Sequence, residues 1–348
     1  MLIMAEAIIQ KMGKIGQITL NRPRALNALT YNMITDIEKA LTEWEYDSSI
    51  EAVLVDAEGS RAFCSGGDIS DLYKQGQKEN YEFGQKFWAD EYRLNALIDG
   101  YSKPYVVFMQ GFTMGGGVGI SCHGSHRIVG KTSRIAMPEC GIGLVPDVGG
   151  SFLLTRKSTN LGIYLGITCS HMDASDAIFA GFADHLISEE KWEEVKRKLI
   201  QTGDPSCLAD FDEKPPSSYL ARNFNVIEKV FSEEKPISLM NKMGHFSQLE
   251  SGLTRLKKAS PLSVLVTLHM LRIPEVSQSV KQALEIEYRY TARAQELTDF
   301  QEGIRAMVVD KDRKPIWKYS SLEAVPKEEV LSLLKPLDNS LGLRLEFL

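Results

Sequence analysis

The sequence predicts an α/β fold with a helical C-terminal region. Three observations indicate this: strand and helix patterns alternate over the first 200 residues, glycine-rich turns follow two of the strands, and helical patterns dominate after residue 200. The chain has 348 residues, more than the roughly 100 to 200 typical of one domain. We therefore expect a core over residues 1–200 and a mostly helical region over residues 201–348.

The N-terminal part predicts a strand, a helix and a second strand. Apolar and β-branched residues at 15–20 indicate the first strand. Thr30 is a suitable N-cap for the helix that follows. In that helix the apolar residues recur at helical spacing, namely Met33, Ile37, Leu41 and Trp44. The stretch AVLVDA at 52–57 predicts the next strand.

The same alternation continues through the middle of the chain. A polar helix is expected near 80–99, and it precedes a buried strand, YVVFMQ, at 105–110. A glycine-rich stretch follows the strand, and two short strands are expected around 127–136. This order of elements is typical of an α/β core.

The pattern changes after about residue 200. The segment at 203–218 contains three prolines and four acidic residues, which indicates a loop or linker. Ser260 and Pro261 then supply an N-cap and a first-turn proline for an apolar helix. Residues 277–298 predict another long helix, so the C-terminal region should be helical.

The charge and hydropathy of the chain exclude several classes of protein. Its 40 lysines and arginines against 46 acidic residues give a net charge of −6, which disfavours nucleic acid as a partner. No run reaches the ~18 consecutive apolar residues of a membrane span. The N-terminal segment has an early Glu6 and no arginine before Arg22, so no secretory or mitochondrial signal is expected. We therefore expect a cytoplasmic protein.

The cysteines do not suggest a disulfide framework or a metal site. There are five, they are scattered, and none forms a CxxC pair, which is typical of buried thiols in a reducing compartment. Cys122, His123 and His126 lie close together in the sequence but lack a second cluster at zinc spacing. We therefore favour packing over metal binding and expect no cofactor.

Two common catalytic signatures are absent from the sequence. There is no GxSxG nucleophile elbow, which argues against an α/β-type serine hydrolase. There is also no GxGxxG spacing among the glycines at 115–119, which argues against a dinucleotide site.

Two glycine-rich turns remain, each after a predicted strand: FCSGGDI at 63–69 and QGFTMGGGVGI at 110–120. Glycine allows a ligand to approach the backbone closely, and a helix N-terminus offers unpaired N–H groups to an anion. Two such donors converging on one carbonyl oxygen would form an oxyanion hole. The alternative for each cluster is tight strand-to-helix packing.

A third segment, AMPECGIGLVPDVGG at 136–150, places Glu139 and Asp147 eight residues apart. Two carboxyls near an apolar site can serve as acid, base or nucleophile. The alternative is a pair of solvated loop acids, because acidic side chains are mostly exposed.

Together these segments resemble the crotonase, or enoyl-CoA hydratase/isomerase, superfamily. The similarity is carried in order by NRPRALNAL, AFCSGGDI, KPYVVFMQGFTMGGGVGI, AMPECGIGLVPDVGG and, near the end, DFQEGIRAMVVDKDRKPIW. The resemblance covers nearly the whole chain. It implies a spiral of strand-strand-helix turns that binds an acyl-CoA thioester, with an extended helical C-terminal region completing the acyl pocket.

The resemblance also implies roles for individual residues. The backbone N–H groups of Gly67 and Gly116 would hold the thioester oxygen. The coenzyme channel would be lined by Ala25, Ala28, Leu29, Asp68 and Ile69. Many relatives form a homo-oligomer through their final helices, but this tail is longer, so the oligomeric state stays open.

The sequence departs from the hydratase pattern at the second glycine turn. Gly119 stands where hydratases have a catalytic glutamate, so the hydration mechanism with two carboxyls is incomplete. Asp147 within PDVGG instead resembles the valine-pathway branch of the superfamily, which hydrolyses 3-hydroxyisobutyryl-CoA. In that branch a glutamate matching Glu91 lines the acyl pocket, whereas the residue pattern alone would make Glu91 a solvated helix residue.

The expected activity is hydrolysis of a short branched 3-hydroxyacyl-CoA, preferably 3-hydroxyisobutyryl-CoA. Glu139 would attack the carbonyl or activate a water, and Asp147 would bind the 3-hydroxyl group. Two alternatives stay open: an enoyl-CoA hydratase or isomerase that uses Glu139 alone, and a non-catalytic acyl-CoA-binding or scaffold protein.

Overall fold

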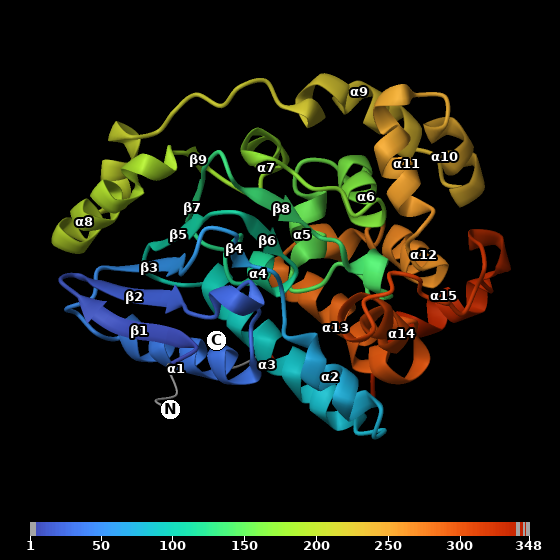
Figure 1. Ribbon diagram of the computed structural model, residues 1–348, viewed down its shortest axis with the longest axis horizontal. Helices are drawn as coiled ribbons and strands as arrows, with labels where there is room; N and C mark the ends of the chain where they lie inside the picture. The colour runs from blue at the N-terminus through green and yellow to red at the C-terminus, as the bar shows by residue number, and fades with distance from the viewer. Residues whose placement is uncertain (1–4, 339–341, 344, 346–348) are drawn as a thin grey trace.

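The computed structural model describes residues 5–338, 342–343 and 345. Two β-sheets lie at the centre of the N-terminal part, and helices cover them (Figure 1). The C-terminal helices pack beside this core rather than extending away from it, and α13 lies along α3. The predicted α/β class is confirmed.

The larger sheet has six strands in the order β1-β2-β3-β5-β7-β9. Only β1 and β2 are antiparallel, and every other neighbouring pair is parallel. Parallel strands need crossover connections, which the intervening helices supply. The bounds are β1 Ala7–Met12, β2 Ile15–Leu20, β3 Ala52–Ala57, β5 Tyr105–Met109, β7 His126–Val129 and β9 His185–Leu186.

The smaller sheet has three parallel strands, β4 Ala62–Cys64, β6 Phe112–Met114 and β8 Arg134–Ala136. Each of these strands follows a strand of the larger sheet along the chain: β4 follows β3, β6 follows β5 and β8 follows β7. The chain therefore winds as a spiral in which each turn adds one strand to each sheet. This arrangement confirms the expected strand-strand-helix repeat.

The helices of the spiral begin where the sequence provides caps. Thr30 caps the first helix, accepting a hydrogen bond from Met33 N at 3.2 Å, and Asp68 caps the second. The α-helices up to residue 202 are α1 Tyr31–Glu45, α2 Ile69–Gly76, α3 Tyr81–Asp99, α4 Gly116–Gly119, α5 Gly150–Thr155, α6 Thr159–Ile167, α7 Ala174–Ala180 and α8 Trp192–Thr202.

In the region after residue 202 the described regular elements are all helices. The predicted linker at 203–218 forms a 3-10 helix, Pro205–Asp210, and then has no regular secondary structure up to α9. Ser260 caps the next apolar helix as expected, accepting from Ser263 N at 3.1 Å. The helices are α9 Tyr219–Phe231, α10 Pro236–Met243, α11 Glu250–Leu256, α12 Pro261–Met270, α13 Val280–Leu297, α14 Phe300–Ile304, the π-helix Arg305–Val309 and α15 Lys327–Leu333.

One hydrophobic cluster contains side chains from both sides of residue 200. Tyr92 of α3 and Tyr290 of α13 are both fully buried in it. A second, smaller cluster lies between the large sheet and α8, where Phe108 meets Trp192 edge to face. The main cluster crosses the expected boundary at residue 200. The division of the chain there therefore remains a prediction from the sequence pattern.

Strand β1 was not expected from the sequence. It is an edge strand, and most of its side chains are exposed or half-buried, so it lacks the buried alternating pattern that identifies a strand. No helix within the described residues has the length and apolar character needed to cross a membrane.

The junction between β4 and α4 depends on glycine at position 117. A Cβ built on Gly117 would lie 2.4 Å from the Cys64 carbonyl oxygen, which is backbone and cannot move aside cheaply. We therefore predict that Gly117→Ala lowers the free energy of unfolding by about 2 kcal/mol or more, as overpacking does. Denaturant titration measures this.

The matched control is Gly141→Ala. The nearest atom to a Cβ on Gly141 is Cys169 Sγ at 3.7 Å, an ordinary contact. Equal destabilisation by the two substitutions would show that the close approach at Gly117 does not limit packing.

Candidate functional site

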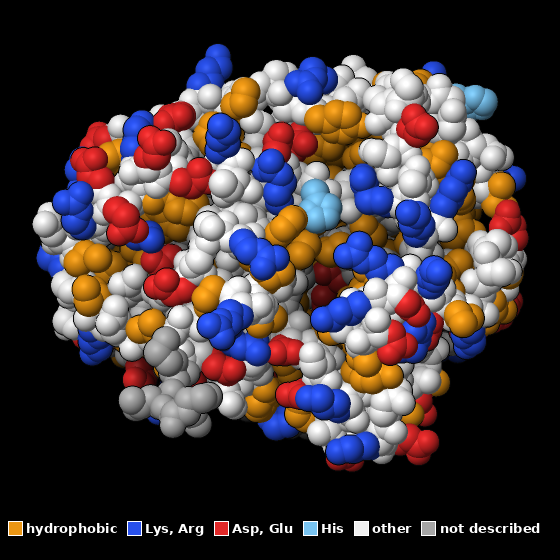
Figure 2. All heavy atoms as spheres, viewed as in Figure 1, with side chains coloured by type: hydrophobic (Ala, Val, Ile, Leu, Met, Phe, Trp, Pro, Cys, Tyr) orange, Lys and Arg blue, Asp and Glu red, His pale blue; other side chains and the backbone are white. Residues whose placement is uncertain are grey.

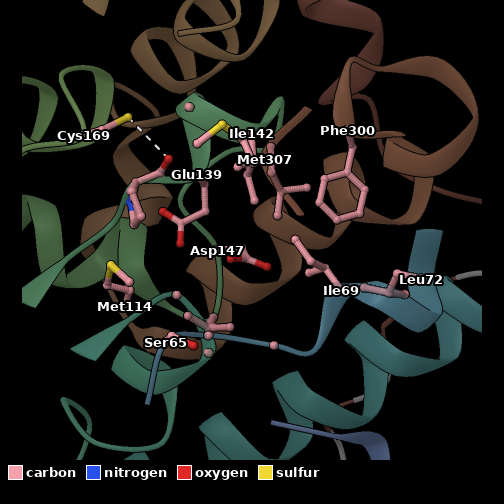
Figure 3. Close-up of a pocket in the computed structure, with 18 of the residues that line it drawn as sticks. Ser65, Ile69, Leu72, Met114, Glu139, Ile142, Asp147, Cys169, Phe300 and Met307 are labelled. Carbon is pink, nitrogen blue, oxygen red and sulfur yellow. Dashed lines mark hydrogen bonds between the residues drawn. The ribbon is translucent and has the colours of Figure 1, made fainter. Parts of the chain in front are cut away.

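A cavity of about 360 Å³ lies where the two glycine turns meet the segment 136–150. Its walls come from both halves of the chain: α3 contributes Phe87, Trp88 and Glu91, and the later helices contribute Arg255, Phe300 and Met307. Figure 3 shows Glu139 and Asp147 side by side in it, with Ser65 and Met114 near one end and Ile142, Met307 and Phe300 near another. In Figure 2 a hollow with acidic atoms at its floor is ringed by lysine and arginine side chains.

The two glycine turns approach each other at backbone distance. A Cβ built on Gly116 would lie 3.2 Å from Gly67 N and 2.5 Å from Glu91 Oε1. Gly115 has a φ of +49° and Gly66 a φ of +112°, conformations that glycine adopts without steric cost. Glycine at these positions therefore allows the backbones to meet beneath the cavity.

The backbone N–H groups of Gly67 and Gly116 are available to a ligand. Leu29 N donates to Gly66 O at 2.9 Å and Asp68 N donates to Leu29 O at 2.7 Å, a pattern that fixes the first turn but leaves Gly67 N–H unused. Within the described part of the chain, neither Gly67 N–H nor Gly116 N–H donates a hydrogen bond. Both glycines line the cavity.

Glu139 begins a short 3-10 helix, Glu139–Ile142, and points into the cavity. Its side chain is only 4% exposed, and its Oε2 atom has no hydrogen-bond partner among the described residues. Burial raises the pKa of Glu139 well above its ordinary value, and the nearby Asp147 carboxyl raises it further. The alternative of a solvated loop acid is therefore wrong for Glu139.

Asp147 is also buried and lines the cavity. Its Oδ2 atom accepts a hydrogen bond of 2.8 Å from the hydroxyl of Tyr92, whose own oxygen lies 3.2 Å from Thr291 Oγ1. Burial raises the pKa of Asp147 to about 7, although the hydrogen bond from Tyr92 opposes the shift. Burial thus favours the protonated form of this carboxyl.

Glu91 is the third carboxyl of the cavity. It lies on the buried face of α3, is 2% exposed, and its Oε1 has no partner among the residues that the structure describes. Burial raises its pKa well above the ordinary value, with a further contribution from Asp147. The residue pattern alone predicted a solvated Glu91, and that prediction is wrong.

The cavity does not include all the residues implied for the coenzyme channel. Ile69 lines it, and Leu29 is buried, 3.3 Å from the position of a Cβ on Gly116. Asp68 instead caps α2 and forms an ion pair of 2.9 Å with Arg22. Ala25 is exposed and Ala28 is half-buried, and neither lines the cavity.

Sequence reasoning missed several residues of the site. Tyr92 and Glu287 contact the Asp147 segment from α3 and α13. Side chains from Phe83 to Leu97 and in the C-terminal helices were expected to shape the pocket, but the individual residues of the wall and rim could not be predicted, because only the folded chain brings them together. They are Leu72, Phe87, Trp88, Met114, Ile142, Cys169, His171, Arg255, Phe300 and Met307.

Position 119 has no room for a larger side chain. A Cβ on Gly119 would lie 2.7 Å from Asn95 Nδ2 and 2.8 Å from Val148 Cβ. Asn95 is fully buried, so the space beside Gly119 is already filled.

In the cluster of Cys122, His123 and His126, the two histidines have hydrogen-bond partners within the protein. His123 Nε2 is 2.8 Å from Val148 O, and His126 Nδ1 is 2.9 Å from Ser125 Oγ. Over the described ranges, no group of three or more His, Cys, Asp or Glu side chains is arranged to hold a metal ion.

The model of the enoyl-CoA hydratase/isomerase family matches residues 15–334. The chain belongs to this family. The family resemblance drawn from the glycine turns and the 136–150 segment is therefore confirmed.

Curated proteins similar to this chain include 3-hydroxyisobutyryl-CoA hydrolases described as mitochondrial. The zebrafish (Danio rerio) protein is 37% identical, over 96% of this chain and 90% of its own length. The human (Homo sapiens) protein is 35% identical, over 96% of this chain and 90% of its own length.

Two solved structures of the family superpose closely but carry other descriptions. An enoyl-CoA hydratase from Rhodobacter sphaeroides is 44% identical, with a TM-score of 0.92 over 98% of this chain and 100% of its own. A carnitinyl-CoA dehydratase from Mycobacterium thermoresistibile is 36% identical, with a TM-score of 0.92 over 98% and 99% of the two chains. Family membership therefore establishes the fold but leaves the reaction to be argued from the site.

The raised pKa of Asp147 makes a prediction about stability. The folded protein binds this proton more tightly than the unfolded chain does. The carboxyl therefore lowers the free energy of unfolding very little below pH ~4, increasingly between pH ~4 and about 7, and by its full amount at higher pH. We predict that Asp147→Asn stabilises the protein at pH 8 by on the order of a few kcal/mol and leaves stability near pH 4 unchanged. Urea unfolding at both pH values measures this.

The control for this experiment is Asp204→Asn. The amide and hydroxyl of Ser206 lower the pKa of the exposed Asp204, so removing that carboxylate should destabilise the protein at pH 8 instead. A stabilisation by Asp147→Asn that is equal at both pH values would contradict the assignment of the shift to this carboxyl.

Proposed function

We propose that this chain hydrolyses the thioester of a short branched 3-hydroxyacyl-CoA, with 3-hydroxyisobutyryl-CoA as the preferred substrate. The observation that carries the proposal is the convergence in one cavity of two free backbone N–H groups and two buried carboxyls, Glu139 and Asp147. The names of the curated relatives support the same reaction. In that role the enzyme would serve a step of valine catabolism.

The N–H groups of Gly67 and Gly116 would form the oxyanion hole. Attack on a thioester carbonyl places negative charge on its oxygen, and donors already oriented toward that position stabilise the transition state more than the ground state. Their lack of other acceptors supports this role, because no existing hydrogen bond has to break when the oxygen binds.

Glu139 would carry out the cleavage by one of two routes. As a nucleophile it forms a mixed anhydride and expels the coenzyme A thiolate, and water then hydrolyses the anhydride. As a general base it takes a proton from water, and the hydroxide attacks the carbonyl directly. Both routes consume one water and release a carboxylic acid and coenzyme A, and both require Glu139 to be ionised when it acts.

Asp147 would bind the 3-hydroxyl group of the substrate and assist proton transfer. A buried polar group that lacks its partner costs free energy, so such a site discriminates strongly against acyl groups without the hydroxyl. The remaining wall around the acyl group is apolar, with Ile69, Trp88 and Phe300 among its residues, which suits a short branched chain.

The substrate would reach this cavity from the side of Arg255 and His171. Arg255 is half-buried and His171 is exposed, and both line the cavity. The proposed reaction needs no metal or redox cofactor, because coenzyme A is part of the substrate. We also propose that the protein acts in the cytoplasm, although the curated relatives are described as mitochondrial.

An enoyl-CoA hydratase or isomerase is the second candidate, favoured by the description of the Rhodobacter sphaeroides structure. Against it, Asn95 and Val148 crowd the position where a second catalytic glutamate would stand at residue 119. A non-catalytic acyl-CoA-binding protein is the third candidate. Buried carboxyls whose oxygens lack hydrogen-bond partners argue against this third candidate, because they lower the stability of the fold and form no contact that compensates.

The deciding assay compares two substrates. We predict release of free thiol from 3-hydroxyisobutyryl-CoA and no loss of enoyl absorbance from crotonyl-CoA. Loss of the enoyl absorbance without thiol release would establish the hydratase instead. Thiol release that is faster from isobutyryl-CoA than from its 3-hydroxy analogue would contradict the role of Asp147.

Glu139→Gln should bind the substrate and lose turnover. We predict a loss of at least about 1,000-fold in kcat, because removal of a nucleophile or base removes the reacting group itself. The dissociation constant for the acyl-CoA, measured by calorimetry, should change little. The matched control is Glu228→Gln, which alters a carboxyl bound to Ser158 and Asn160 outside the cavity. Unchanged turnover in Glu139→Gln would remove this residue from the mechanism.

A further inference from the structure

The segment 147–151, here called the Asp147 loop, has an unusual backbone. Val148 has a φ of +56° and Gly149 a φ of +74°. Glycine adopts positive φ freely, but a β-branched residue such as valine does so only under strain. Such strain persists only where the surroundings over-determine the conformation, so contacts around the loop must hold it in place.

The main contacts come from Glu287 on α13. This side chain is fully buried, and its carboxyl accepts hydrogen bonds from Gly149 N at 2.7 Å and from Ser151 N at 2.9 Å. It also accepts a hydrogen bond from the Ser151 hydroxyl. One carboxyl thus binds three donors on the loop that carries Asp147.

Two other side chains hold the loop from different directions. His123 donates from Nε2 to Val148 O at 2.8 Å, and burial lowers its pKa to about 4, so the ring is neutral at neutral pH. Tyr92 donates to the Asp147 carboxyl itself. Glu287 is therefore the only one of the three that binds two backbone N–H groups of the loop.

We propose that Glu287 is a positioning residue that holds the strained Asp147 loop so that Asp147 faces Glu139 and the thioester. This inference rests on the proposed function. Glu287 does not line the cavity, so it acts through the loop rather than by touching the substrate.

Glu287 is packed among other acidic groups. Burial raises the pKa of Glu287 to about 8, and Asp147 contributes to that shift. The hydrogen bonds of Glu287, rather than a charge, therefore hold the loop. Among the described residues, no lysine or arginine forms an ion pair with Glu287, Glu139 or Asp147. The other titratable groups nearby are Glu91, Tyr92, His123 and, beyond His123, Arg156.

The test is Glu287→Gln, which keeps the side-chain shape and turns one acceptor into a donor that opposes the loop N–H groups. We predict that kcat for 3-hydroxyisobutyryl-CoA falls by about tenfold or more while KM changes by less than about threefold. An unchanged kcat, or a loss of kcat matched by an equal rise in KM, would overturn the proposal.

The matched control is Asp176→Asn. Asp176 of α7 is also a buried carboxyl that accepts a backbone N–H, from Leu220 at 2.8 Å, but it does not line the cavity. A merely structural effect lowers the melting temperature in both variants without a selective loss of kcat. If Asp176→Asn reproduced the loss of kcat at nearly constant KM, the positioning role would be excluded.

Hydrogen exchange separates this inference from the proposed function. If the parent protein released no thiol from 3-hydroxyisobutyryl-CoA, the hydrolase assignment would fail, and exchange would decide the positioning role alone. We predict faster exchange by roughly tenfold or more at the amides of Gly149 and Ser151 in Glu287→Gln, because both lose their acceptor. Unchanged exchange at these amides would overturn the proposal.

Discussion

The close approach of the two glycine turns is the constraint on which the rest of the structure depends. Gly67 N and the position of a Cβ on Gly116 are 3.2 Å apart, so a side chain at residue 116 would displace either the first turn or Glu91. Each turn follows a strand of the small sheet, and the parallel pairing of β4 with β6 sets the distance between them. The spiral therefore fixes two N–H groups beside one cavity without any side chain taking part.

Several acids are buried in and around this cavity. Four carboxyls, those of Glu91, Glu139, Asp147 and Glu287, are buried, and burial raises the pKa of each. Uncharged carboxyls are less costly to bury than ionised ones, and both glycines with unused N–H groups line the same cavity. Burying these carboxyls therefore lowers the stability of the protein at neutral pH. The same burial provides the site with groups whose charge can change during a reaction.

Much of the spiral could be predicted, because local patterns determine it. The caps at Thr30 and Ser260 and the apolar run at 105–109 each identified an element correctly. The edge strand Ala7–Met12 could not be identified, since its exposed side chains show no buried pattern. Motif resemblance placed Glu139 and Asp147 in one site, but their burial depends on helices far away in the sequence. No local signal in α13 marks Glu287 as a partner of the Asp147 loop, because the contact spans 136 residues or more.

The central claim is that two main-chain N–H groups hold the thioester oxygen while Glu139 reacts at its carbon. A crystal structure of Glu139→Gln with intact 3-hydroxyisobutyryl-CoA tests it most directly. The account predicts the thioester oxygen at about 3 Å from both Gly67 N and Gly116 N, with the residue 139 side chain facing the carbonyl carbon. A thioester oxygen that contacts neither nitrogen, in a fully occupied complex, would contradict the account.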